Sequence, residues 1–443
     1  MMYMAVRAAS VFIFILATAS LAGAQPQPAQ AAEEQRLRDV RGVADADLNE
    51  DGSRVFVRLR NGEISLWDVA EGTRIEGELD SAPAATCYAM SGDGRFVVVG
   101  FEAGSRVFDA ATGAAVSPPL DVRLQCQLRP NAVFSPDGAT LVMISGKEAT
   151  VWKVTTGEKL AAIALGAGPH EDAPAGASFT ATGAHCFVMG PDGVVTRFET
   201  QSWTPAGKPM QHPAAPSAYD FAFEARADGN WLATFDGAGE NGPKGHLQIW
   251  DGLASKKVGA PLVGVNGFSA KFLPDPPRVI VEAARGNASV RALPSLKVLY
   301  SIPAHDDVEG PSIAVTPDAK WLVTWGSDRS LKALDAATGK MSSIQPDKAT
   351  IRGVILAPDS SSCFVIYDNS TFATSGFQDH YVMRLRLPEL NVTGAFRSSA
   401  YLGRVSLSRN GRRLLVLEGS GDEDQRVLVF NARDMMPVGN LHE

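Results

Sequence analysis

Three short clusters in the sequence contain residue types that could bind a nucleotide or a metal ion. Residues 237–242 (GAGENG) have the GxGxxG spacing of a dinucleotide loop, but Pro243 and a strand-like run follow where a helix would be needed. Residues 47–52 (DLNEDG) imitate the start of a calcium loop, whose twelfth position would here be Arg58 instead of glutamate. Residues 305–309 (HDDVE) could bind a metal or transfer protons, but this histidine falls at a recurring position of the repeat described below. The sequence therefore predicts no metal site and no cofactor.

Nucleophilic catalysis finds equally little support. There is no GxSxG elbow, and the seven histidines are spread over different parts of the chain. The four cysteines form no CxxC or Cys/His cluster. Cys186 and Cys363 lie in strand-like runs, whereas Cys87 and Cys126 could pair if their strands meet with an irregular offset. We expect no catalytic residue from these patterns.

The N-terminus has the pattern of an export signal. One basic residue precedes an apolar run over 8–21, and the small residues Ala22-Gly23-Ala24 are suited to signal-peptidase cleavage before Gln25. This predicts a signal peptide over 1–24 and a flexible Pro/Gln/Ala-rich tether over 25–35. We expect an exported protein, periplasmic or secreted, with no membrane insertion after cleavage.

The charge of the chain argues against two classes of partner. The chain has 41 basic and 49 acidic residues, a net charge of −8, and no long basic run. Nucleic acids and anionic membranes attract clustered Lys and Arg, so neither is an expected partner.

The elements that would position any site come from one repeat, which the sequence contains nine times. Residues 132–160 show the unit: an alternating strand, the turn Asp137-Gly138, a second strand, a third strand ending at Trp152, and another turn. Such turns recur on average about every 45 residues from Asp51-Gly52 to Asn410-Gly411. Several short strands per unit at this period predict the blades of an all-β propeller over 36–443, with eight or nine four-stranded blades.

The repeat resembles that of the WD40-like propeller family. The residues that carry the resemblance stand at the family's recurring structural positions: Trp67, Asp68, Phe108, Asp109, Trp152, Trp250, Asp251, His305 and Asp328. In the unit from Ile302 to Lys340, position 334 is leucine instead of Trp, so the family's His–Asp–Ser/Thr–Trp network is incomplete there. The resemblance implies a rigid platform for protein partners, although this fold supports many activities.

Three repeats are longer than the others between their second and third strands. From the first turn to the Trp-Asp position most repeats need 15 or 16 residues, whereas the fifth needs 22, the eighth 28 and the ninth 20. All three insertions should emerge on one face of the fold. They are either tolerated variation in loop length or parts of a binding surface. The residues predicted to contact a partner there are Asp236, Asn241, Lys244, His246, Asp368, Phe372, Phe377, Asp379, His380, Asp422, Glu423 and Asp424.

The sequence therefore predicts a monomeric interaction platform without catalytic activity, whose protein partner it does not identify. The alternative is a periplasmic propeller enzyme. Residues 334–340 and 108–113 resemble blade ends of quinoprotein dehydrogenases, but that family's nearby Trp is missing after both. A lactonase-type hydrolase, which needs carboxylates at the mouth of the propeller, is the other enzymatic possibility.

Overall fold

The computed structural model describes residues 40 and 42–438 apart from short segments. These are residues 80, 125–130, 169–174, 214–220, 237–244, 284–286, 304, 306–311, 327, 347–349, 369–379 and 420–424. The described residues form strands, turns and bends and include no helix, as the strand alternation predicts. The expected signal peptide and tether lie outside this description.

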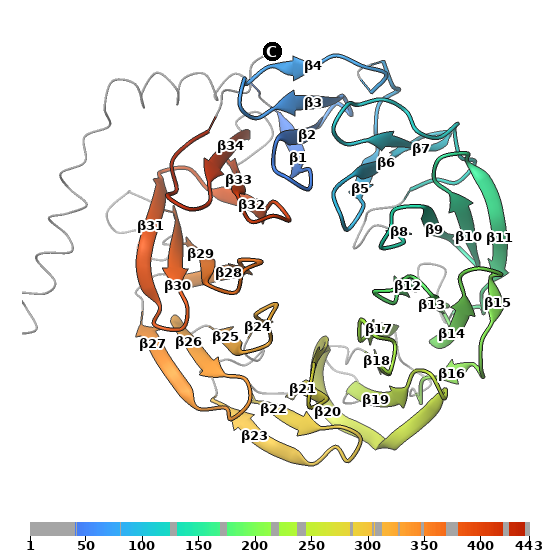
Figure 1. Cartoon of the computed structure of the whole chain (residues 1–443), viewed down its shortest axis with the longest axis vertical. Coiled ribbons are helices and arrows are strands. Elements are labelled where there is room, and N and C mark those ends of the chain that lie inside the picture. Colours follow the sequence, from blue (N-terminus) through green and yellow to red (C-terminus); the bar gives the residue numbers. More distant parts are fainter. Residues whose placement is uncertain are drawn as a thin grey trace, which may run out of the picture.

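Successive segments of the chain form antiparallel sheets arranged radially around one axis, with the first strand of each sheet innermost (Figure 1). The first four blades consist of β1 (Val43–Leu48), β2 (Arg54–Leu59), β3 (Ile64–Asp68) and β4 (Arg74–Ile75); β5 (Cys87–Met90), β6 (Phe96–Phe101) and β7 (Gly104–Asp109); β8 (Ala132–Phe134), β9 (Thr140–Ser145), β10 (Glu148–Lys153) and β11 (Glu158–Ala164); and β12 (Gly176–Phe179), β13 (His185–Met189), β14 (Val194–Glu199), β15 (Thr204–Pro205) and β16 (Met210–Gln211).

The remaining strands continue around the ring in chain order. They are β17 (Phe221–Ala225), β18 (Trp231–Asp236), β19 (Gly245–Asp251), β20 (Lys256–Leu273), β21 (Arg278–Ala283), β22 (Asn287–Ala292) and β23 (Val298–Ile302); β24 (Ser312–Val315), β25 (Trp321–Trp325), β26 (Ser330–Asp335) and β27 (Met341–Pro346); β28 (Thr350–Leu356), β29 (Ser362–Asp368), β30 (His380–Arg386) and β31 (Asn391–Ser398); and β32 (Leu402–Leu407), β33 (Arg413–Glu418) and β34 (Arg426–Asn431).

The number of blades follows from one long strand. The 18-residue β20 pairs with β19 through its first half and with β21 through its second, so it is both the outermost strand of the fifth blade and the innermost strand of the sixth. Across the described residues the sheets therefore amount to nine blades, which resolves the expected choice between eight and nine. In the second and ninth blades, isolated bridges at Ala115, Leu120 and Pro437 stand in for a regular fourth strand.

The predicted first turns all connect an innermost strand to the second strand of its blade. At Gly138 φ is +69°, and the Asp137 carboxylate accepts hydrogen bonds from Ser135 Oγ and Ala139 N at 2.6 and 3.0 Å. The hydrogen bond from Ser135 lowers the pKa of Asp137 below its usual value. Ala319 and Ser360 adopt the same positive φ without being glycine, at +54° and +61°. The repeat therefore imposes this turn geometry even where the residue opposes it.

The core lies between blades, where the faces of neighbouring sheets pack together. Between the fourth and fifth blades, for example, Phe187 and Val195 pack with Leu232 and Trp250. At the closure of the ring, residues of the ninth blade such as Val416 join the first blade's Val55 in one buried cluster. A single sheet could not bury both of its faces, so each blade depends on its neighbours for stability.

Two further features complete the fold. Cys87 is disulfide-bonded and Cys186 and Cys363 are free, while Cys126 lies outside the described residues. Burial raises the pKa of the Cys363 thiol to about 12, which fits the small core residue expected from its strand-like surroundings. A search of the described residues for helices long and apolar enough to cross a membrane gave none.

Candidate functional site

The three long insertions share one face of the ring. They connect β18 to β19, β29 to β30 and β33 to β34, and each links the second strand of a blade to its third. We call the face at which these strands end the loop face, and the opposite face, which carries the first turns, the turn face. The predicted contact residues Asn241, Lys244, Phe372, Phe377, Asp379, Asp422, Glu423 and Asp424 lie outside the described residues, whereas Asp236, His246, Asp368 and His380 stand at the bases of two insertions.

The base of every long insertion is closed by an acid–base pair between its two flanking strands. Asp236 Oδ2 lies 3.1 Å from His246 Nδ1, and Asp368 Oδ1 lies 3.4 Å from its cross-strand neighbour His380 Nδ1. In the ninth blade Glu418 contacts Arg426 across the same position.

In the other six blades, the facing residues at this position form no such pair in the described part of the chain. Among the described residues, their second and third strands end on the loop face in the pairs Arg58–Ile64, Phe101–Gly104, Ser145–Glu148, Met189–Val195, Ala283–Asn287 and Trp325–Leu331. None of these joins an acid to a base. The pairs therefore accompany loop length and hold the two ends of each long loop together.

In the fifth blade the pair belongs to a buried network that sequence reasoning missed. His212 Nδ1 lies 2.8 Å from Thr234 Oγ1, which also accepts a hydrogen bond from Trp250 Nε1 at 2.9 Å. His212 Nε2 approaches the Asp236 carboxylate to 3.7 Å. Although burial would raise it, the pKa of Asp236 is lowered by the contacts with His212 and His246.

This is the His–Asp–Ser/Thr–Trp arrangement that the family resemblance implies. A signal for it existed, because His212 precedes the recognised Trp250-Asp251 by 38 residues within the fifth repeat. Asp236 is 3% exposed, so the residue predicted to contact a partner lies beneath the loop surface. Its part in partner binding stays a prediction.

The seventh blade has the same network without the tryptophan. His305 lies 2.7 Å from Asp328 Oδ1 through Nδ1 and 2.9 Å from Thr324 Oγ1 through Nε2. The ring of His305 is buried, and Leu334 stands where the indole would donate. His305, one of the residues that could have bound a metal, is therefore held by side chains of its own blade.

Tyr401 joins the bases of the eighth and ninth insertions. It lies in the connection between β31 and β32, where its ring meets His380 edge-on at a centroid distance of 5.6 Å. Its backbone oxygen accepts a hydrogen bond from Gly419 N at 2.7 Å, and Arg352 covers the ring with its guanidinium 4.3 Å from the centroid. Tyr401 as a whole residue is 36% exposed, so this part of the loop face presents an aromatic residue to solvent.

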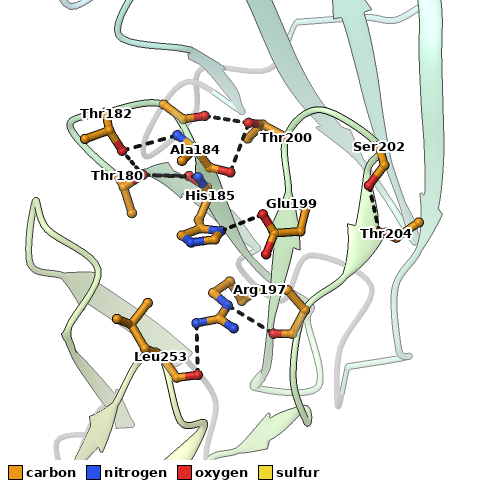
Figure 2. A network of polar contacts seen from close by, with 12 residues as sticks. Thr180, Thr182, Ala184, His185, Arg197, Glu199, Thr200, Ser202, Thr204 and Leu253 are labelled. Carbon is orange, nitrogen blue, oxygen red and sulfur yellow. Dashed lines mark hydrogen bonds and ion pairs between the residues drawn. The ribbon is translucent and has the colours of Figure 1, made fainter.

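Figure 2 shows a polar network on the turn face, between the fourth and fifth blades. His185 Nδ1 lies 3.3 Å from Glu199, and Arg197 donates to the backbone oxygens of Leu253 and Ala206, both at 3.0 Å. Most of the donors in this network serve backbone oxygens of turns. The network therefore fastens two blades together on the face opposite the long insertions.

Close to the axis, the innermost strands of the ninth, first and second blades bring a charged cluster together. Arg404 contacts Asp45 at 2.7 Å and Asp47 at 2.8 Å, and Tyr88 donates a hydrogen bond from its hydroxyl to Asp47 at 3.2 Å. Burial raises the pKa of Asp47 to about 6 against the opposing charge of Arg404.

The two other candidate clusters also lie at connections between consecutive strands of a blade. In the stretch that imitates a calcium loop, Asn49 Oδ1 accepts Arg54 N at 2.9 Å and Asp51 Oδ1 accepts Ser53 N at 2.9 Å. The glycine-rich stretch 237–242 is flanked by strands on both sides, β18 and β19. A search of the described residues found no group of three or more His, Cys, Asp or Glu placed to hold a metal ion.

The Trp-Asp positions recur at the end of the third strand and have a local structural task. Asp68 Oδ1 accepts hydrogen bonds from Ala70 N and Glu71 N, both at 2.9 Å, in the turn that follows β3. Asp109 does the same for Ala111 and Thr112 at 3.0 and 2.9 Å. These carboxylates close the turn between the third and fourth strands.

Comparison with known proteins gives likenesses in structure alone. No protein-family model matches the chain. No curated protein sequence matches it either. The C-terminal WD40 domain of Sif2 superposes with a TM-score of 0.50 at 14% identity, covering 88% of this chain and 97% of its own. A eukaryotic initiation factor superposes with a TM-score of 0.61 at 13% identity, and the match covers 87% of this chain and 94% of that protein. Dihydro-heme d1 dehydrogenase NirN, in complex with DHE, superposes with a TM-score of 0.51 at 16% identity, and the match covers 81% of this chain and 76% of NirN.

Proposed function

We propose that this chain, which has the fold of a WD40-like propeller, is an exported and monomeric interaction platform without catalytic activity of its own. Its loop face would bind one or more protein partners through the insertions of the fifth, eighth and ninth blades. The observation that carries the proposal is the acid–base pair at the base of each long insertion. Loops tolerated as mere length variation need no such closure.

The loop face also has the composition that partner surfaces favour. Aromatic and arginine side chains are enriched in protein interfaces, and Arg352 stacked on the exposed ring of Tyr401 supplies both next to two of the insertions. His380 supports that ring from within the eighth blade. A platform with such an anchor loses little conformational entropy when it binds.

Shortening the eighth insertion tests this function. Residues 369–379 are replaced by a two-residue Asn-Gly turn, which suits a tight hairpin and leaves Asp368 and His380 in place. We expect an unchanged melting temperature together with loss of the proteins that the full chain captures by cross-linking in its native compartment. Capture is measured by quantitative mass spectrometry against the unaltered chain.

A matched control alters the turn face instead. Glu158 and Lys159 are exposed at the start of β11, and replacing both by alanine should leave capture intact. If the shortened variant captures the same set of proteins as the control, the eighth insertion is not a contact surface and the proposal fails.

A second candidate function is an enzyme acting close to the axis, of the quinoprotein-dehydrogenase or lactonase type. The observation in its favour is Asp47, because a carboxyl with a pKa of about 6 can exchange protons near neutral pH. The structurally similar NirN is a dihydro-heme d1 dehydrogenase.

A thermal-shift screen separates the two functions. The full chain is heated with calcium, pyrroloquinoline quinone plus calcium, lactones or small sugars, since a ligand at 100 times its Kd adds about 2.7 kcal/mol of stability. A rise in melting temperature with one compound that is lost in Asp47→Asn would favour the enzyme. No rise across the panel would favour the platform.

A further inference from the structure

A cavity of about 380 Å³ opens on the turn face between the eighth and ninth blades. Three turns form its walls: residues 357–359 after β28, residues 410–413 up to the start of β33, and residues 431–433 from the end of β34. The beginning of β29 and the end of β30 complete it, through Ser362 and Arg384. It lies on the face opposite the long insertions, so it is separate from the proposed partner surface.

The lining of this cavity is strongly basic. It includes Arg384, Arg412, Arg413 and Arg433, against the single carboxylate of Asp359. The chain as a whole has a net charge of −8, so its composition does not account for four arginines in one place. Within the described part of the chain, no carboxylate lies within ion-pairing distance of any of the four guanidinium groups.

Two buried donors of the cavity wall also lack a partner. Ser362 is 2% exposed, and its Oγ makes no hydrogen bond. The Nε of Arg384 is also buried and makes no hydrogen bond. Arg384 is nevertheless held in place, because its Nη1 donates to Arg433 O at 3.1 Å and to Thr393 Oγ1 at 3.4 Å. A buried donor without an acceptor is costly, and native proteins rarely keep one without a reason.

Both observations are explained by the same missing group. An oxyanion would supply negative charge to the guanidinium groups and acceptor oxygens to Ser362 Oγ and Arg384 Nε. Guanidinium groups bind phosphate and carboxylate oxygens through parallel hydrogen bonds, which a lysine cluster would not do. The cavity volume leaves room for an organic part beyond the anionic group.

We propose that this cavity is a binding site for a small organic molecule that carries a phosphate or carboxylate group. Arg412 and Arg433 attract and hold the anion at the mouth of the cavity. Ser362 and Arg384 bind its oxygens at the wall.

Calorimetric titration of the full chain tests the site, with inorganic phosphate and citrate as the two probes at constant ionic strength. The double variant Arg412→Glu/Arg433→Glu alters exposed side chains, so folding should survive, and we expect affinity to fall by at least about tenfold because two charge-assisted contacts become repulsive. Ser362→Ala should weaken binding by about threefold to tenfold through loss of one hydrogen bond. Binding of phosphate or of citrate shows which oxyanion the site prefers.

The control carries the same change in charge elsewhere on the turn face. Lys153→Glu/Lys340→Glu alters exposed residues next to the corresponding turns of the third and seventh blades and should bind like the unaltered chain. The proposal is overturned if neither probe binds saturably. It is also overturned if both double variants lose affinity equally, or if Ser362→Ala binds as tightly as the unaltered chain.

Discussion

Asp328 shows how single polar side chains stabilise this ring. Its carboxylate accepts hydrogen bonds from Ser330 N at 3.0 Å and Ser330 Oγ at 2.8 Å, and it lies 2.7 Å from His305 Nδ1. Lys332 Nζ lies 3.4 Å away. Burial alone would raise the pKa of Asp328, but the hydrogen bonds outweigh burial and lower it from 3.8 to about 2.

Replacing this carboxylate should change stability in a pH-dependent way. The folded protein holds Asp328 ionised at pH values where the unfolded chain has begun to take up a proton. The stabilisation is therefore present above about pH 4 and is lost as the pH falls towards 2. We expect Asp328→Asn to lower the free energy of unfolding by about 2 kcal/mol at neutral pH, with the difference from the unaltered chain shrinking below about pH 4.

Denaturant titrations of both proteins over this pH range measure the effect. Asp121→Asn, at an exposed carboxylate of the second blade, serves as the control and should be neutral throughout. A loss that stays constant down to about pH 2 would mean that the aspartate acts through shape and not through charge.

At the scale of the element, the turns of one blade fit against the side chains of the next. Gly339, in the turn after β26, has a φ of +72°, and a Cβ placed there would lie 2.2 Å from the ring of Tyr300 in β23. The Tyr300 hydroxyl donates to Ala336 O in the same turn at 2.6 Å. The sixth and seventh blades are therefore joined by a contact that tolerates only glycine.

Gly339→Ala should destabilise the protein by more than backbone strain alone. Gly146 provides the comparison, because its φ is also positive, +57°, but nothing lies within 4 Å of its missing side chain. We expect Gly146→Ala to cost about 1 kcal/mol and Gly339→Ala about 2 kcal/mol more, measured as changes in urea unfolding. Equal losses would show that the Tyr300 ring moves aside freely.

Local sequence patterns predicted the strands and turns well. Recurring turns, four of them Asp-Gly, and strand alternation located all nine units, because each depends on residues adjacent in the chain. β20 was not anticipated, since a strand shared by two blades depends on how the blades meet. The arginine cavity was missed for the same reason, whereas the network around His212 was missed although His212 stands in the fifth repeat, 38 residues before Trp250. The cavity unites residues of two neighbouring blades, and no periodicity encodes that proximity.

The whole molecule closes by packing. Every described sheet draws its strands from consecutive segments, and none combines strands from both ends of the chain. The ninth and first blades meet through their shared core, through Arg404 with Asp45 and Asp47, and through Asn410 Nδ2, which donates to Asp51 O at 2.8 Å. Among the described residues, this seam is therefore held by a buried apolar cluster, ion pairs and a few hydrogen bonds, not by a sheet that both ends of the chain share.

Removing the arginine should loosen the seam locally. In Arg404→Met the carboxylates of Asp45 and Asp47 remain side by side without a cation, so amide hydrogen exchange in β1 and β32 should accelerate by about tenfold. Arg197→Met is the control, because it removes contacts between the fourth and fifth blades and should accelerate exchange only there. Uniform acceleration around the ring after Arg404→Met would mean that the blades open together and that the seam has no separate stability.

Closure by packing also bears on how such a ring changes in evolution. Where the last sheet contains strands from both ends of a chain, gain or loss of a repeat must keep two distant halves matched. Here the described strands of each sheet are encoded by a continuous stretch of gene, so unequal recombination can add or delete a whole blade while the described strands of every remaining sheet stay together. Only a boundary within β20 would divide a strand that two blades need. A ring of this kind can therefore change its number of blades one repeat at a time.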